Sequence, residues 1–260
     1  MSKISPMAII EDGAVIGNDV EIGAYCFISS LSTIGDGTKI EQGSCIYGKT
    51  TIGKNNHIFS HAVIGSAPQD LKFAGEDVEL IIGDNNKIRE FTLFNPGTKG
   101  GGGKTIIGSH NLFMGYVHIG HDVIIGNNCI LANAATLAGH VEMGDYAVIG
   151  GMTPIHQFVH IGEYAMVAGA SALAQDVPPF CMAEGNRATL RGLNLTGLRR
   201  HLEREDIDEL KSAYRDLFEA GKPLKEIANE LLEKTTNRHV QSLCNFALET
   251  KRGIPYERKH

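Results

Sequence analysis

The sequence predicts a parallel β-helix followed by a small helical domain, because the spacing of its apolar residues changes along the chain. Isoleucine occupies ten consecutive positions six residues apart, from Ile10 to Ile64. The six-residue spacing returns at Ile82 and, after a shift of one residue, continues from Ile107 to Leu173. Beyond residue 192 the apolar residues follow a helical spacing instead, which is typical of helices that bury one face.

A spacing of six fits neither an α-helix nor the alternation of one long strand. It fits short extended segments separated by sharp corners, and three such segments make a triangular coil of 18 residues. Successive coils stack about 4.8 Å apart. Each aliphatic side chain that is buried inside the coil stabilises the fold by about 1.5–3 kcal/mol. Glycine and asparagine, as at Gly37 and Asn127, suit the corners. We expect this solenoid from about residue 4 to residue 180.

Two stretches break the spacing. Residues 66–79 contain Pro68-Gln69-Asp70-Leu71-Lys72, and residues 95–103 contain Pro96 and four consecutive glycines. A regular prism has no cleft of its own, so such excursions are natural places for binding or catalysis. Surface insertions without a function are the alternative, and for the second stretch the two interpretations are equally supported.

The last coil is expected to end at Pro178-Pro179, and three helices follow. Ile207, Leu210 and Leu217 lie on one helix face, Gly221 stops that helix, and Pro223 suits the start of the next. Further apolar faces lie within 224–232 and 240–246. The sequence therefore predicts a β-helix domain over residues 1–190 and a helical domain over residues 191–260.

Composition excludes several classes of protein. The formal net charge is -6, which argues against a nucleic-acid partner because that needs a basic surface. No apolar run approaches the roughly 18 residues of an integral membrane segment, and the N-terminus shows no apolar stretch of a signal peptide. Five scattered cysteines without a CxxC pair favour a reducing compartment. We expect a cytoplasmic protein.

Six of the eleven histidines lie between residues 110 and 160. One of them, His121, is the first of three residues that the coil is expected to stack in a column. A coil of 18 residues places Gly139 and Gln157 in line with His121, about 5 Å apart. An imidazole can remove a hydroxyl proton, and a glycine N–H can stabilise a tetrahedral oxyanion by about 3 kcal/mol. Asp122 could fix the imidazole tautomer. This pattern favours acyl transfer to a hydroxyl.

Other interpretations stay open at this point. His118, His121 and His140 could bind zinc, as in a metal-dependent β-helix hydratase. The shared repeat also fits an acetyl-CoA-dependent acetyltransferase, or a scaffold without catalytic function. Arginines in the segment 189–200 suit phosphate groups, although an ordinary charged helix start explains them equally well.

Five motifs together are more specific than the repeat. They are Gln69-Asp70-Leu71-Lys72-Phe73-Ala74-Gly75-Glu76, His118-Ile119-Gly120-His121-Asp122, the segments 130–140 and 149–158, and Ala174-Gln175-Asp176-Val177-Pro178-Pro179. Over nearly the whole chain, the sequence resembles the UDP-N-acetylglucosamine O-acyltransferase family, which starts lipid A synthesis. The resemblance implies a left-handed coil, a homotrimer with active sites between subunits, and no cofactor or metal. It implies transfer of an (R)-3-hydroxyacyl chain from acyl carrier protein to the 3-position of the UDP-sugar.

The resemblance also assigns roles to single residues. His121 matches the base, Asp122 its supporting acid and Gly139 the oxyanion donor. Gly169 matches the position that limits acyl length, here to about 14 carbons. The positions that match the family's substrate-binding residues are Asp70, Lys72, His118, His140, His156 and Gln157 for the sugar, phosphate or acyl groups, and Asn194 and Arg200 for the nucleotide.

Some positions depart from the family pattern. Asn95 stands where a histidine is common, and His201 stands where an arginine is common. These positions bear on the acceptor, and a 3-amino sugar that forms an amide remains an alternative to the 3-hydroxy sugar. Acyl carrier protein is acidic, so we expect a local basic patch to receive it. The candidates are Arg187, Arg191, Arg199 and Arg200.

Overall fold

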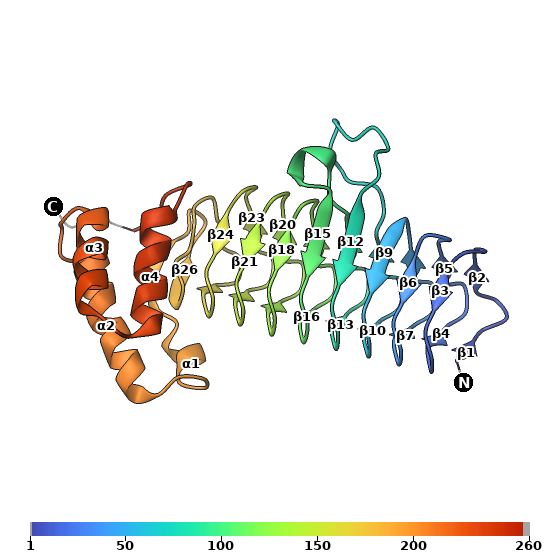
Figure 1. The fold of residues 1–260 in the computed structure, drawn as a ribbon, viewed down its shortest axis with the longest axis horizontal. Helices are drawn as coiled ribbons and strands as arrows, with labels where there is room; N and C mark the ends of the chain where they lie inside the picture. Colours follow the sequence, from blue (N-terminus) through green and yellow to red (C-terminus); the bar gives the residue numbers. More distant parts are fainter. Residues whose placement is uncertain (1, 257–260) are drawn as a thin grey trace.

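The computed structural model describes residues 2–256 as a triangular prism of three sheets with helices at its C-terminal end (Figure 1). Each coil gives one short strand to each face, so strands three apart in chain order pair side by side.

The strands of the first face are β1 (Lys3–Ile4), β4 (Glu21–Ile22), β7 (Lys39–Ile40), β10 (His57–Ile58), β13 (Lys87–Ile88), β16 (Leu112–Phe113), β19 (Ile130–Leu131), β22 (Val148–Ile149), β25 (Met166–Val167), β26 (Cys181–Glu184) and β27 (Thr189–Leu193). Those of the second face are β2 (Ile9–Ile10), β5 (Phe27–Ile28), β8 (Cys45–Ile46), β11 (Val63–Ile64), β14 (Leu93–Phe94), β17 (His118–Ile119), β20 (Thr136–Leu137) and β23 (Pro154–Ile155). Those of the third are β3 (Val15–Ile16), β6 (Thr33–Ile34), β9 (Lys49–Ile52), β12 (Glu79–Ile82), β15 (Lys104–Ile107), β18 (Ile124–Ile125), β21 (Glu142–Met143) and β24 (His160–Ile161).

The strand register confirms the 18-residue coil. Parallel pairing places His118 opposite Thr136, and Thr136 opposite Pro154. The residues predicted to point inward fill the prism, and Ile28, Ile46, Ile58 and Ile64 are each 0% exposed. Apolar burial of this stacked column holds the coils in register, because a slip of one residue would turn the isoleucines outward.

The corners use more residue types than the expected glycine and asparagine. Asp122, His140 and Phe158 take left-handed backbone conformations, with φ of 59°, 61° and 63°. Such a conformation costs a residue with a side chain about 1–2 kcal/mol. Hydrogen bonds to the preceding coil offset this cost, as in His140 N–H to the His121 carbonyl at 2.9 Å.

Both predicted excursions leave the prism at the same edge. The segment 65–78 joins β11 to β12, and the segment 95–103, with the short 3₁₀ helix η1 (Lys99–Gly101), joins β14 to β15. Both therefore run from the second face to the third and project together above the prism (Figure 1). We call the corner between these two faces the loop edge. The corner that contains His121, between β17 and β18, is part of it.

The C-terminal region differs from expectation at its start. β26 and β27 form an antiparallel hairpin on the first face, so the expected boundary at residues 190/191 falls inside β27. The helices that follow are α1 (Leu195–Leu198), α2 (Arg204–Phe218), α3 (Leu224–Lys234) and α4 (Arg238–Glu249). No helix within residues 2–256 is long and apolar enough to cross a membrane.

The last described residues return to the prism and tie the helices to it. The buried Asp176 carboxylate accepts hydrogen bonds from the Thr250 hydroxyl at 2.6 Å and from His160 N–H at 2.9 Å. Leu190 N–H also donates to the Pro255 carbonyl at 2.7 Å. The helical region therefore packs on the last coil as one body with the β-helix.

Candidate active site

His121 lies on the loop edge, in the corner that follows β17. Its Nδ1 atom is 2.8 Å from Oδ2 of the adjacent Asp122. The Asp122 side chain is only 1% exposed, whereas the His121 side chain is 17% exposed. A carboxylate only accepts hydrogen bonds, so this contact places the imidazole proton on Nδ1. The lone pair of Nε2 is then left free to take a proton.

The glycine-rich segment 95–103 covers the Asp122 carboxylate. The N–H of Thr98 donates to Oδ1 at 2.8 Å, and its hydroxyl donates to Oδ2 at 2.6 Å. The Asp122 N–H donates in turn to the Thr105 hydroxyl at 2.8 Å. Each carboxylate oxygen therefore has a donor supplied by the chain itself, which fixes its orientation beside His121.

Gly139 lies one coil beyond His121, as the register requires. A Cβ built on Gly139 would lie 2.6 Å from Nε2 and 3.0 Å from Nδ1 of His121, so the imidazole rests against this glycine. The Gly139 N–H makes no hydrogen bond within residues 2–256. Backbone N–H groups at the equivalent corner position are also without a hydrogen bond at His121 and Gln157, but of the three residues only Gly139 is buried and has no side chain of its own beside the N–H.

His140 continues the site toward the next coil. Its ring meets the His121 ring edge-on at 5.0 Å between centroids and stacks on Phe158 at 4.3 Å. Burial lowers the pKa of His140, and the nearby Asp122 carboxylate partly opposes this shift. The neutral ring is therefore favoured at this position, and it forms an aromatic wall beside His121.

His118 points outward from β17 near His121. Burial lowers its pKa as well. Its Nδ1 atom is buried and has no hydrogen-bond partner within residues 2–256. The column of His121, Gly139 and the neighbouring histidines thus has the features that an acyl-transfer site needs.

Known proteins share this architecture. A model of the second domain of UDP-N-acetylglucosamine O-acyltransferase matches residues 176–255, and a bacterial transferase hexapeptide model matches residues 104–139. The acyl-[acyl-carrier-protein]–UDP-N-acetylglucosamine O-acyltransferase of Sulfurimonas denitrificans is 92% identical over 260 residues, covering 100% of both chains. The chain belongs to the UDP-N-acetylglucosamine O-acyltransferase family.

Solved structures of the family agree with this assignment. The UDP-N-acetylglucosamine acyltransferase of Campylobacter jejuni is 51% identical and matches 98% of this chain and 100% of its own with a TM-score of 0.95. A structure from Acinetobacter baumannii is 41% identical and covers 96% of this chain and 98% of its own at 0.94. The expected fold class, a left-handed parallel β-helix with a small helical C-terminal domain, is confirmed.

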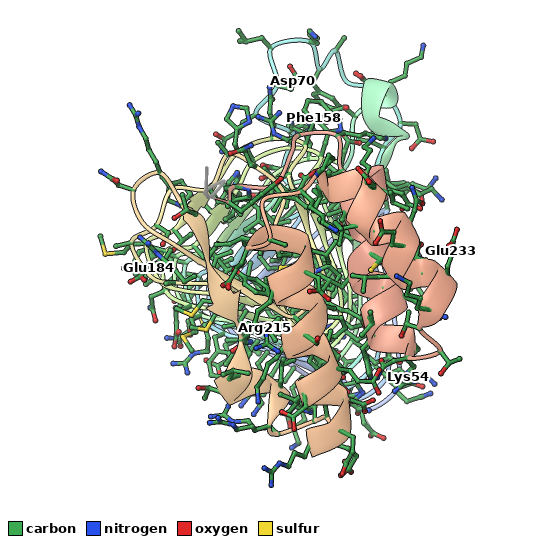
Figure 2. All side chains as sticks on the ribbon, turned by 90° about the vertical axis from the view of Figure 1, so that its left-hand side faces the viewer. Lys54, Asp70, Phe158, Glu184, Arg215 and Glu233 are labelled. Carbon is green, nitrogen blue, oxygen red and sulfur yellow. The ribbon has the colours of Figure 1, made fainter. Side chains whose placement is uncertain are left out.

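The first excursion brings Asp70 toward the histidine column. The negative charge of Asp70 acts on His140, so this loop reaches the histidine column. Viewed from the helical end, Asp70 and Phe158 lie on the same side of the prism (Figure 2). Lys72 is exposed on the same loop, and its N–H donates to the Asp70 carboxylate at 3.0 Å. The buried Asn95 amide holds the start of this loop by donating to the Ser66 and Ala67 carbonyls at 3.0 and 3.1 Å.

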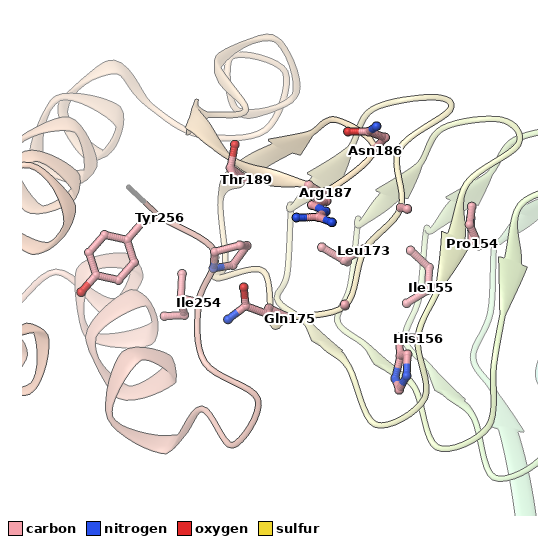
Figure 3. Close-up of a pocket in the computed structure, with 14 residues that line it drawn as sticks. Pro154, Ile155, His156, Leu173, Gln175, Asn186, Arg187, Thr189, Ile254 and Tyr256 are labelled. Atoms are coloured by element: carbon pink, nitrogen blue, oxygen red, sulfur yellow. The ribbon is translucent and has the colours of Figure 1, made fainter. Parts of the chain in front are cut away.

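A pocket of about 750 Å³ lies beyond the far end of the histidine column (Figure 3). His156 and Gln157 are exposed next to one another there, and His156 Nδ1 is 3.1 Å from the Gln157 carbonyl. The bridge between Ile155 and Leu173 puts Gln175 one coil past Gln157 in the same column. The pocket is lined mainly by apolar residues, with polar groups from His156, Gln175, Asn186, Arg187 and Thr189.

Three positions to which the sequence resemblance assigned a role lie away from His121 within one chain. Asn194 is buried where it begins α1, with Oδ1 accepting from Gly197 N–H at 3.1 Å and Nδ2 donating to the Tyr164 carbonyl at 3.0 Å. Arg200 is exposed just past α1. Asn194 contacts the corner between the third and first faces, which is a different edge from that of His121. Gly169 is exposed at the remaining corner, after β25.

Sequence reasoning missed Thr98 as a partner of Asp122. The 18-residue arithmetic fails here because an insertion separates the two residues, which lie 24 apart. A usable signal exists nonetheless: the glycine-rich segment leaves the same corner one coil before His121. Excursions from one edge of a β-helix should therefore be read together.

A metal-binding group is also geometrically available. Ligand atoms of His121, Asp122 and His140 lie within 4.8 Å of one another. The Asp122 Oδ2 atom already accepts hydrogen bonds from His121 and from the Thr98 hydroxyl. His118, which the zinc interpretation required, is not part of this group.

Proposed function

We propose that this chain transfers an (R)-3-hydroxyacyl group from acyl carrier protein to the 3-hydroxyl of UDP-N-acetylglucosamine, in the cytoplasm, as the first step of lipid A synthesis. The observation that carries the proposal is that His121 Nε2 lies against Gly139, whose N–H makes no hydrogen bond within residues 2–256. The name of the relative at 92% identity supports the same donor and acceptor.

The proposed chemistry follows from these positions. His121 Nε2 takes the proton of the sugar hydroxyl as its oxygen attacks the thioester carbonyl, an effect of about 10²- to 10⁴-fold on the rate. The Gly139 N–H donates to the tetrahedral oxyanion, worth about 3 kcal/mol. Collapse breaks the carbon–sulfur bond, and the leaving thiolate takes the proton back from the imidazolium. Asp122 keeps the imidazole oriented throughout. A 3-amino acceptor would lose its proton to the same Nε2 atom.

We also propose that the active form is a homotrimer with sites between subunits. Within one chain Asn194 and His121 occupy different edges, so a second subunit is needed to bring the nucleotide residues to the base. An exposed apolar ridge supports self-association. It runs along the corner between the first and second faces, and Tyr25, Phe91, Tyr116 and Met152 are 67%, 50%, 61% and 73% exposed in it. The His61–Phe91 and Phe91–Tyr116 rings stack at 5.5 and 5.2 Å.

In this proposal the acyl donor binds at the glycine and the arginines that have not yet been given a role. The acyl chain ends near Gly169, and Arg187, Arg191, Arg199 and Arg200 receive the acidic carrier protein. The nearest atom to a Cβ at Gly169 would be the Gly151 carbonyl oxygen at 3.4 Å, so the fold has room for a side chain there. Its absence leaves space for a long chain.

A product assay tests the reaction. Purified protein is incubated with 3-hydroxyacyl carrier proteins of several lengths and with both UDP-sugars, and the products are identified by mass spectrometry. We expect a 3-O-acyl UDP-sugar that disappears in His121→Ala and persists in His110→Ala, an exposed histidine on another edge. Full activity in His121→Ala would disprove the role of His121, and turnover of acetyl-CoA alone would favour an acetyltransferase.

Mixing two inactive variants tests the shared site. His121→Ala and Arg200→Ala subunits are co-expressed with different tags and purified as mixed trimers. Activity should return in the mixture, because one interface combines the intact halves of both variants. Mixed trimers that stay inactive, although each variant folds and assembles, would place the whole site within one chain.

A further inference from the structure

Two residues of the glycine-rich segment, Thr98 and Gly101, lie against the Asp122 carboxylate. Thr98 uses both its N–H and its hydroxyl on the Asp122 carboxylate, at 2.8 and 2.6 Å. Thr98 and Asp122 are only 6% and 5% exposed. Water therefore has little access to replace either hydrogen bond.

Gly101 approaches the same carboxylate from the side. A Cβ at Gly101 would overlap the Asp122 carboxylate carbon and both of its oxygens. The preceding residue, Gly100, has no atom within 4 Å of the equivalent position. Neither glycine has a positive φ, so backbone strain would not make a side chain less acceptable at one than at the other. The two positions differ because only a side chain at Gly101 would meet the Asp122 carboxylate.

The segment is itself held in place. The Thr98 carbonyl accepts hydrogen bonds from Gly101 and Gly103 at 3.0 and 2.8 Å. Both ends of the segment bind Glu79 in β12, with Gly97 N–H donating to its carbonyl at 3.2 Å and Gly103 accepting from its N–H at 2.8 Å. Thr98 thus belongs to a closed turn anchored on a strand, which limits its movement.

We propose that Thr98 and Gly101 form a clamp that positions Asp122 and, through it, the imidazole of His121. The inference rests on the proposed role of His121 as base. Oδ1 is held by the Thr98 N–H, and Oδ2 is shared between the Thr98 hydroxyl and His121 Nδ1. A carboxylate held at both oxygens cannot rotate, so the ring that it binds keeps Nε2 directed at the acceptor. Thr98 is a positioning residue and does not itself touch the substrate.

The first test removes only the hydroxyl. Thr98→Val should lower kcat by about 10- to 100-fold, with KM for the UDP-sugar changed less than about twofold. The acid limb of the pH profile of kcat/KM should move to higher pH, because Oδ2 then gives its hydrogen-bonding capacity to His121 alone. Thr98→Ser keeps the hydroxyl and should restore most of the rate and the original profile. If Thr98 only supported the fold, Thr98→Val would not lower kcat and shift the pH profile while leaving KM nearly unchanged.

The second test uses the two adjacent glycines as a matched pair. Gly101→Ala should lower kcat at least as much as Thr98→Val, because the methyl group displaces the carboxylate. Gly100→Ala adds the same methyl group to open space and should keep kcat within about twofold. Melting temperatures of both variants are measured alongside, so that a loss of folded protein is recognised.

A double-mutant cycle separates the clamp from the base. In an Asp122→Asn background, adding Thr98→Val should cost much less than it does in the native protein, since both act through one carboxylate. Loss of activity in His121→Ala combined with native kcat and pH profile in Thr98→Val, or additive losses in the cycle, would overturn the clamp and leave the proposed function standing. Full activity in His121→Ala would overturn the proposed function itself.

Discussion

The imidazole of His121 lies against the α-carbon of Gly139, so closely that a methyl group on that carbon would sit 2.6 Å from Nε2. Register, and not chain proximity, creates this contact, since the two residues are 18 apart on stacked coils. The same contact places the nitrogen that would accept a proton next to the N–H that would stabilise an oxyanion.

Gly139→Ala should therefore disable transfer while the prism still folds. The added methyl group pushes the His121 ring away and covers the N–H, and we expect kcat to fall by about 10²- to 10³-fold. Overpacking of this kind destabilises a protein by about 1–3 kcal/mol, which melting curves would register as a modest shift. Steady-state kinetics at saturating substrates measure the effect. A folded variant with native kcat would show that this N–H takes no part in the reaction.

Gly169→Met should shorten the acyl chain that the protein prefers. The glycine is exposed, and the fold accepts a side chain there without a backbone clash, so the methionine would extend into the space proposed for the end of the acyl chain. Competition among acyl carrier proteins that bear chains of different length, read by mass spectrometry, gives the preference. Gly169→Ala serves as control and should shift it less. An unchanged preference in Gly169→Met would place the acyl end elsewhere, with the apolar pocket near Leu173 as the next position to test.

The six-residue period was enough to predict the coil, the inward residues and the column of His121, Gly139 and Gln157, because stacking turns sequence spacing into spatial position. It could not place Thr98, since an insertion removes the register between it and Asp122. Nor could it show that Asn194 lies on another edge, because that depends on how α1 packs against the corner at Tyr164. The left-handed corners at His140 and Phe158 also escaped prediction, because backbone hydrogen bonds between coils stabilise them.

Stability should fall as the pH drops from about 7.5 to about 5, and His118 and His140 should contribute to the loss. Burial lowers the pKa of both imidazoles in the folded protein, whereas the unfolded chain binds a proton near pH 6.5. Their contribution is therefore complete above about pH 6.5 and is lost as the pH falls toward the lowered values of the folded state. His118→Gln should flatten the dependence of melting temperature on pH. His156→Gln, at an exposed position, should leave the slope unchanged, and equal slopes for all three proteins would contradict the assignment.

Removal of metal ions should not abolish transfer. His121, Asp122 and His140 offer ligand atoms within 4.8 Å of one another, so zinc chemistry is the main alternative at this site. In the proposed mechanism, however, the proton must remain on His121 Nδ1, where it is donated to the Asp122 carboxylate, and a metal bound at that position would compete with this proton. Dialysis against a chelator, elemental analysis and an activity assay are combined. We expect full activity in metal-free protein and inhibition on adding excess zinc, whereas loss of activity that stoichiometric zinc restores would replace the base mechanism by a metal-dependent one.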